Sequence, residues 1–261
     1  MMSEKNSSIS GVGTIASGEY GQIHLSGSGT ITGDVVCEGL QTSGSSHAKG
    51  KVECRGAVVT SGAFHGEGDV KAVEVHTSGS SHFGGNLTVE KRIKTSGSTR
   101  VEGNLEVESA ETSGSLSVGG NLNASKLHTS GKLEVGKDCA AEEFSSSGRL
   151  DIGGLLNAGT VEIELSSTAD SMVREIGGEK ITVIWKPALS LLNRIFGANR
   201  NTMLETEVIE GDEVKLEQTR VKVVRGRDVT IGAGCYAKLV EYSGVLRVAD
   251  GATVEQQVKV D

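Results

Sequence analysis

The chain has 261 residues, a net charge of −8, 37 glycines, one proline and only 3% aromatic residues. An acidic chain with so few aromatic rings lacks the basic face and the stacking platforms with which proteins bind nucleic acid. The same composition argues against a thick globular core, and it suits a narrow repetitive fold filled by small aliphatic side chains.

The N-terminal segment is polar, because Met1 to Ser10 contains no apolar run. We therefore expect residues 1–12 to be disordered and expect no signal peptide, and no stretch of about 18 apolar residues predicts a membrane span. From Gly13 to Leu25 we expect a first, imperfect turn of the repeat. Its apolar residues Ile15, Ile23 and Leu25 would cover the open end of the fold.

Residues 13–165 are organised by a repeat built on the phrase Thr-Ser-Gly. Its glycines recur at a nearly constant spacing, at Gly27, Gly44, Gly62, Gly79, Gly97, Gly114, Gly131 and Gly148. Apolar residues stand four positions before each glycine and four, eight and ten positions after it, and they alternate with polar residues as in a strand with one buried face. A unit this short cannot bury its apolar face alone.

The predicted fold is therefore all-β, a parallel β-helix whose turns stack about 4.8 Å apart. Two steps of the repeat, from Gly44 to Gly62 and from Gly79 to Gly97, are longer than the others by a single position. We expect this extra position to lie in a loop at a corner of the turn.

Threonines form a further column whose parity points inward, and stacked hydroxyls there could hydrogen-bond along the column. Its members are Thr42, Thr60, Thr77, Thr95, Thr112 and Thr129. One alternative function is an adhesin-like or ice-binding surface, and a threonine ladder that binds ice would need these threonines to face outward.

The four cysteines, Cys37, Cys54, Cys139 and Cys235, do not form a CxxC motif. Cys37 and Cys54 share one inward column, and Cys139 lies in another. We expect reduced thiols that pack as small hydrophobes, which suits a reducing cytoplasm.

Three histidines, His47, His65 and His82, occupy the same outward position on successive turns. We expect parallel, stacked rings without a neighbouring carboxylate, exposed to solvent and not converging on a metal ion. His24, His76 and His128 are also expected to face outward. The sequence shows no phosphate loop, dinucleotide fingerprint or HExxH motif, so we predict no catalytic residue, no metal and no cofactor.

Residues 166–204 interrupt the repeat. Ser171 to Trp185 is predicted to be a β-hairpin around Gly177-Gly178, and the segment from Pro187 to Gly197 a short amphipathic helix. A lateral or membrane contact is expected at Trp185, Leu189, Leu192, Ile195 and Phe196. Residues 205–261 resume the β-helix, since Val229 and Ile231 recur one repeat later as Leu246 and Val248.

Several C-terminal phrases, Ile209-Glu210-Gly211-Asp212-Glu213-Val214, Val223-Val224-Arg225-Gly226 and Val240-Glu241-Tyr242-Ser243 among them, carry a resemblance to a known family. With its repeat, the chain resembles the bactofilins, polymer-forming bacterial cytoskeletal proteins. The resemblance implies a right-handed parallel β-helix, filaments that form without nucleotide, and association with the cytoplasmic face of the membrane.

We therefore expect a cytoplasmic, non-enzymatic scaffold, peripheral to the inner face of the cell membrane, that polymerises through the apolar ends of its β-helix. The expected partners are further copies of the chain, with a paralogous subunit and a membrane surface as further candidates and no nucleic acid. The expected polymer interface comprises Ile15, Ile23, Leu25, Val248, Val254, Val258 and Val260. The alternative enzyme class is a hexapeptide-like solenoid acyltransferase, which would place a catalytic histidine in a long loop; residues 166–204 contain none.

Overall fold

The computed structural model describes residues 5–166, 169–186 and 202–261. These residues form 24 β-strands and no helix, and the strands pair in parallel as successive turns of a solenoid. The prediction of an all-β parallel β-helix is confirmed. The chain divides into two compact units, residues 1–126 with 134–136 and residues 127–133 with 137–261.

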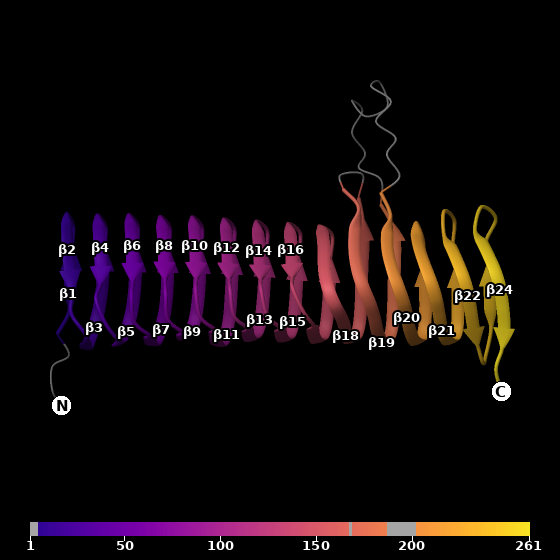
Figure 1. Cartoon of the computed structure of the whole chain (residues 1–261), viewed down its shortest axis with the longest axis horizontal. Helices are drawn as coiled ribbons and strands as arrows, with labels where there is room; N and C mark the ends of the chain where they lie inside the picture. The colour runs from indigo at the N-terminus through magenta and orange to yellow at the C-terminus, as the bar shows by residue number, and fades with distance from the viewer. Residues whose placement is uncertain (1–4, 167–168, 187–201) are drawn as a thin grey trace, which may run out of the picture. The chain divides into compact units, whose positions relative to one another are not determined.

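The first unit alternates long strands with strands of four residues (Figure 1). Its strands are β1 (Ser7–Ile9), β2 (Val12–Ile15), β3 (Gly18–Leu25), β4 (Ser28–Ile31), β5 (Val35–Thr42), β6 (Ser45–Ala48), β7 (Val52–Thr60), β8 (Ala63–Gly66), β9 (Val70–Thr77), β10 (Ser80–Phe83), β11 (Leu87–Thr95), β12 (Ser98–Val101), β13 (Leu105–Thr112) and β14 (Ser115–Val118). The boundary between the units falls within β15 (Leu122–Thr129) and β16 (Lys132–Val135).

The solenoid begins earlier than the sequence suggested. Residues 1–12 were expected to be disordered, but β1 pairs with β3 and places Ser7 opposite Ile23 and Ile9 opposite Leu25. Even a polar segment can add a strand here, because the backbone groups of β3 need partners regardless of side chain.

The longer steps of the repeat are accommodated inside strands and not in corner loops, which corrects the expectation. In β7 the register shifts between Cys54 and Ala57, and in β11 it shifts between Val89 and Arg92. Each shift is a β-bulge that leaves the extra residue unpaired and lets the columns on either side continue.

The core of the first unit consists of the predicted apolar columns. The column that begins at Ile23 and continues through Leu40, Val58, Val75 and Ile93 is at most 1% exposed, and its members lie opposite one another in the strand register. A sixth inward column, two residues after each glycine, escaped the sequence reasoning because only half of its members are large apolar residues. It comprises Gly29, Ser46, Phe64, Ser81, Thr99 and Leu116 in the first unit and Leu133 and Leu150 in the second, all buried.

The threonine column faces inward as predicted, which excludes it as an exposed flat surface. Thr95 Oγ1 donates to Thr112 Oγ1 at 3.1 Å, along the column. Thr60 and Thr77 instead pair with the sixth column on the next turn, with 2.6 Å between Thr60 Oγ1 and Ser81 Oγ and 2.6 Å between the Oγ1 atoms of Thr77 and Thr99. Hydroxyls supplied by other turns thereby satisfy part of this polar core column, whereas the buried hydroxyls of Thr42 and Thr129 have no hydrogen-bond partner among the described residues.

One corner of the turn is held by an Asp or Asn side chain that accepts a backbone N–H from the turn that follows. Asp69 Oδ1 accepts from Asn86 N, Asn86 Oδ1 from Asn104 N, and Asn104 Oδ1 from Asn121 N, each at 2.9 Å. These residues recur at the repeat spacing, so the sequence carried this signal. The bonds satisfy corner backbone groups that the strand ladder leaves open.

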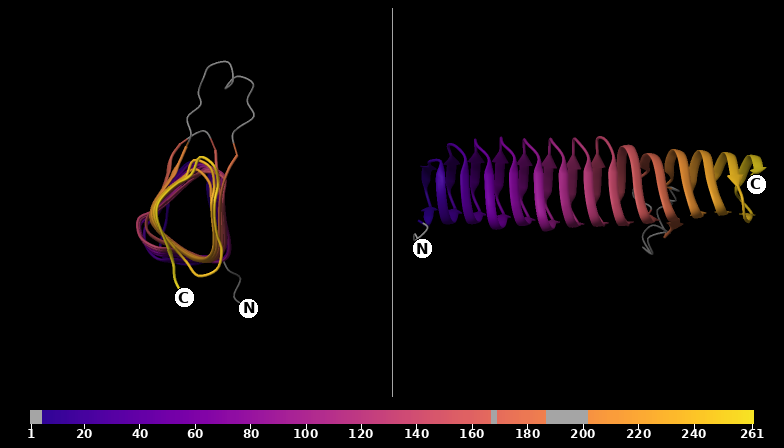
Figure 2. Two further views of the ribbon diagram at one scale, coloured as in Figure 1. Left: turned by 90° about the vertical axis from the view of Figure 1, so that its right-hand side faces the viewer. Right: turned by 90° about the horizontal axis from the view of Figure 1, so that it is seen from below.

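The second unit has longer strands, and one strand often runs through most of a turn (Figure 2). Its strands are β17 (Cys139–Ser146), β18 (Arg149–Leu165), β19 (Ser171–Trp185), β20 (Leu204–Leu216), β21 (Thr219–Ile231), β22 (Tyr236–Tyr242), β23 (Leu246–Val248) and β24 (Thr253–Lys259). The resumption of the β-helix is confirmed, with Val229 opposite Leu246 and Ile231 opposite Val248.

The predicted hairpin at residues 171–185 is wrong. β19 is one continuous strand that pairs in parallel with both β18 and β20, and Gly177 lies opposite Asn157 and Glu210. A Cβ atom at Gly178 would lie 2.3 Å from the Ala158 carbonyl oxygen. The glycine pair therefore permits close approach between turns, where the sequence suggested a chain reversal. The helix predicted from Pro187 to Gly197 lies outside the described residues.

Substitution of a repeat glycine tests how closely successive turns approach each other. A Cβ at Gly97 would lie 2.0 Å from the Gly79 carbonyl oxygen, whereas one at Gly11 would meet nothing within 4 Å. We expect Gly97→Ala to destabilise the protein by at least about 1–3 kcal/mol through overpacking and Gly11→Ala to leave the unfolding midpoint in urea unchanged. Equal midpoints for the two variants would contradict the close approach of the turns.

The internal hydroxyl pairs make a second prediction. Thr60→Val should lower the free energy of unfolding by about 1–3 kcal/mol, because it leaves the buried Ser81 hydroxyl without its partner. Thr129→Val is the matched control, since the buried Thr129 hydroxyl makes no hydrogen bond among the described residues; this variant should be at least as stable as the parent. Denaturant unfolding of both proteins measures the difference, and a Thr60→Val variant as stable as Thr129→Val would count against the pairing.

Candidate functional site

The N-terminal turn presents one strand edge without a partner among the described residues, since β1 pairs with β3 and β2 with β4. Ile15, Ile23 and Leu25, predicted to form this end, are 3%, 0% and 1% exposed. Ile15 lies in the end turn, but Ile23 and Leu25 lie one turn further in, beneath Ser7 and Ile9. The prediction is therefore corrected for Ile23 and Leu25, because the polar N-terminal segment supplies the outermost turn.

The core columns end, without a covering turn among the described residues, at the C-terminal turn. Val248 lies opposite Ile231, which is fully buried, yet Val248 is 42% exposed because no described strand covers its other side. Val254 lies opposite buried Ala237 and is half-buried. These two predicted interface residues thus stand in core positions at an open edge, where β23 and β24 each have a strand partner on one side only among the described residues.

Val258 and Val260 are different, although the sequence grouped them with Val254. Val258 lies opposite Glu241, at a position outside the buried column, and Gln257 lies opposite the buried Val240. Val258 and Val260 are 43% and 42% exposed. Val258 therefore points away from the interior of the last turn, and Val260 follows the end of β24.

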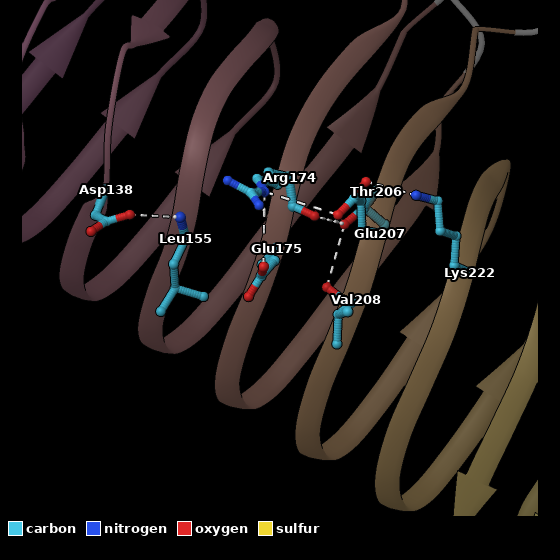
Figure 3. A network of polar contacts seen from close by, with 8 residues as sticks. All are labelled: Asp138, Leu155, Arg174, Glu175, Thr206, Glu207, Val208 and Lys222. Carbon is cyan, nitrogen blue, oxygen red and sulfur yellow. Dashed lines mark hydrogen bonds and ion pairs between the residues drawn. The ribbon is translucent and has the colours of Figure 1, made fainter.

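The side of the second unit carries charged pairs between successive turns (Figure 3). Lys222 Nζ lies 2.7 Å from Glu207 Oε1, and Arg174 Nε lies 3.9 Å from Glu207 Oε2. The hydrogen bond from Lys222 holds the pKa of Glu207 below its usual value. Such exposed pairs contribute little stability, but they place opposite charges next to each other on neighbouring turns. The hydrogen bond from a backbone N–H to an Asp side chain of the preceding turn, seen at a corner of the first unit, also occurs here: Leu155 N donates to Asp138 Oδ1 at 2.9 Å.

An apolar hollow of about 470 Å³ adjoins this network and is lined in part by Met172, Val173, Val221 and Tyr236. Met172 is 56% exposed. Of the predicted lateral contact only Trp185 is described: its side chain is half-buried and its backbone N–H donates to Glu217 Oε2 at 2.9 Å. Leu189, Leu192, Ile195 and Phe196 lie outside the described residues, so this contact stays a prediction. No helix in the described ranges is long and apolar enough to cross a membrane.

The cysteines are free and buried, as predicted. Burial raises the pKa of the Cys139 thiol to about 12 and that of the Cys235 thiol to about 11. Both thiols are protonated at neutral pH and pack as hydrophobic groups, which does not fit a nucleophile.

The histidine column differs from the expectation in two respects. Its rings meet edge to face: His47 and His65 have centroids 5.0 Å apart and an interplanar angle of 73°, and His65 and His82 have values of 4.7 Å and 78°. Carboxylates also lie beside the rings, with His47 Nε2 2.7 Å from Glu67 Oε1 and His82 Nε2 3.2 Å from Glu102 Oε1. The sequence reasoning missed these carboxylates because each belongs to the turn after its histidine.

The remaining histidines lie in separate surroundings. His76 Nε2 contacts Glu74 Oε2 at 3.3 Å, and His128 Nδ1 contacts Ser145 Oγ at 2.8 Å. Both contacts are at the surface. Neither brings together the nucleophile, base and orienting acid of a hydrolase.

Comparison with known proteins gives partial similarity. No family model matches the chain, and no solved structure matches it. Two proteins of Bacillus subtilis (strain 168), the uncharacterized proteins YhbE and YhbF, are each 39% identical to it over 107 residues. That segment is 41% of this chain and 44% and 42% of the two relatives, so the similarity spans less than half the length of each protein compared.

Proposed function

We propose that this protein is a non-enzymatic scaffold that assembles end to end, without nucleotide, through the open turns of its solenoid. The observation that carries the proposal is the C-terminal edge. Val248 continues a core column in register with Ile231 and yet is 42% exposed. A further turn on that edge would complete both the apolar column and the strand ladder.

The energetics favour such an addition. Each parallel strand added to β23 or β24 gains backbone hydrogen bonds at a spacing of about 4.8 Å. Covering an aliphatic side chain such as Val248 contributes about 1.5–3 kcal/mol. Because each added copy again presents an open turn, association does not close after one contact, and contacts that do not close build filaments.

The resemblance of the sequence to the bactofilins supports the same proposal and implies association with the inner face of the cell membrane. Free, buried cysteines fit a cytoplasmic protein. The partner is a second copy of this chain. A paralogous subunit is a further candidate, since two relatives of this chain occur in one organism.

Sedimentation tests the proposal. We expect the purified protein to pellet on ultracentrifugation without nucleotide and to show filaments by electron microscopy. Val248→Asp should remain in the supernatant, because assembly would bury its carboxylate without a partner against an apolar column.

Val258→Asp is the matched control, because Val258 is equally exposed, at 43%, but lies opposite Glu241 and outside the core columns. It should pellet like the parent. Circular dichroism should show both variants folded. Pelleting of a folded Val248→Asp variant would show that this edge is not the interface.

A further inference from the structure

We propose that His47, His65 and Glu67 form a binding site for a divalent late first-row metal ion, with Zn²⁺ as the ion to test. The site lies on the side of the first unit. It does not depend on the assembly proposed above, because none of these residues belongs to an end turn.

The three side chains already converge. One ligand atom from each lies within 4.8 Å of the other two, and His47 Nε2 and Glu67 Oε1 are 2.7 Å apart. Tetrahedral Zn²⁺ binds nitrogen and oxygen at about 2.0–2.2 Å. Ligand atoms around such an ion are therefore separated by about 3.3–3.6 Å, which is within the 4.8 Å that already encloses the three ligand atoms.

The backbone fixes the three positions in advance. β6 and β8 pair in parallel with His47 opposite His65, so these two histidines are held at the spacing of adjacent strands. Glu67 follows β8, two residues after His65, and its backbone N–H donates to the Ala48 carbonyl at 2.8 Å. That bond places Glu67 beside the residue that follows His47. The site needs little ordering when a metal binds, which favours affinity.

The donor set selects the class of metal. Two imidazoles and one carboxylate suit Zn²⁺, Ni²⁺, Cu²⁺ or Fe²⁺, whereas Ca²⁺ and Mg²⁺ prefer oxygen ligands alone. The side chains of His47 and Glu67 are 37% and 50% exposed, and a hollow of about 360 Å³ beside the rings is lined by His47, His65 and His82. Water or an exogenous ligand can therefore complete the coordination.

A related pair, His82 and Glu102, lies two turns further along the stack, and its carboxylate already accepts a hydrogen bond from an arginine. Glu102 Oε1 lies 3.2 Å from His82 Nε2 but also accepts a hydrogen bond from Arg100 Nε at 2.7 Å. Arg100 stands where the next histidine of the column would be, since it lies opposite His82. Its hydrogen bond and charge hold the pKa of Glu102 below its usual value. A guanidinium at this position repels a metal cation, so Glu102 is the natural comparison for Glu67.

The test is a titration of the full chain with Zn²⁺, measured by calorimetry, after bound metal has been removed with a chelator. We expect one equivalent to bind, and we expect Glu67→Gln to weaken that binding by more than the roughly tenfold that losing an outer-shell partner costs. His65→Gln should do the same. The matched control Glu102→Gln should bind Zn²⁺ like the parent. Circular dichroism of the metal-free variants checks that each is folded.

Substitution of Co²⁺ supplies a spectroscopic readout, because visible absorption bands report its coordination. The bands should appear with the parent and Glu102→Gln and be lost with Glu67→Gln. Absence of a stoichiometric binding event in the parent would overturn the proposal. An equal loss in Glu67→Gln and Glu102→Gln would overturn the assignment of the ligands.

Discussion

Parallel, in-register hydrogen bonding between successive turns is the constraint on which the rest of this structure depends. It places each residue over its equivalent one turn away, so that every side chain must pack against the equivalent residues of the neighbouring turns. Cys37 lies opposite Cys54 in one column, whereas Phe64 and Phe83 belong to two different inward columns and pack with ring centroids 5.4 Å apart. The same spacing leaves no room for a Cβ atom at the repeat corner, where a side chain at Gly44 would lie 2.0 Å from the Gly27 carbonyl oxygen.

This constraint also explains why the ends of a solenoid matter for function. Stability in a repeat fold arises from each turn and its contact with the next, so the last turn keeps an unmatched face. At the C-terminal edge that face includes Val248 and the edges of β23 and β24. At the N-terminal edge the outermost turn is more polar, with Ser7 and Ile9 over Ile23 and Leu25. The two edges therefore differ chemically while sharing the same strand geometry.

Stacking also creates the outward columns. Residues remote in sequence become neighbours when the number of residues between them is close to one turn, as for His47 and Glu67, which are 20 residues apart. A column that changes from His82 to Arg100 changes the electrostatics of its surface within one step. Two chemically different sites can thus arise on adjacent turns from the same backbone.

The sequence by itself determined the fold class, the period and most of the core, because apolar residues alternate along strands and return at the spacing of the repeat glycines. It also predicted the inward threonines and, for Cys37, Cys54 and Cys139, the burial of the cysteines from column position. It did not reveal the column containing Ser46, Ser81 and Thr99, because no local pattern marks these polar residues as buried, and the hydroxyls that pair with Ser81 and Thr99 come from other turns. Gly177-Gly178 was misread as a reversal, because glycine serves both tight turns and close approach between strands. The orientation of the exposed histidines was likewise decided only by the tertiary structure, because their rings turn toward neighbours and carboxylates contributed by other turns, and local sequence patterns carry no record of those contacts.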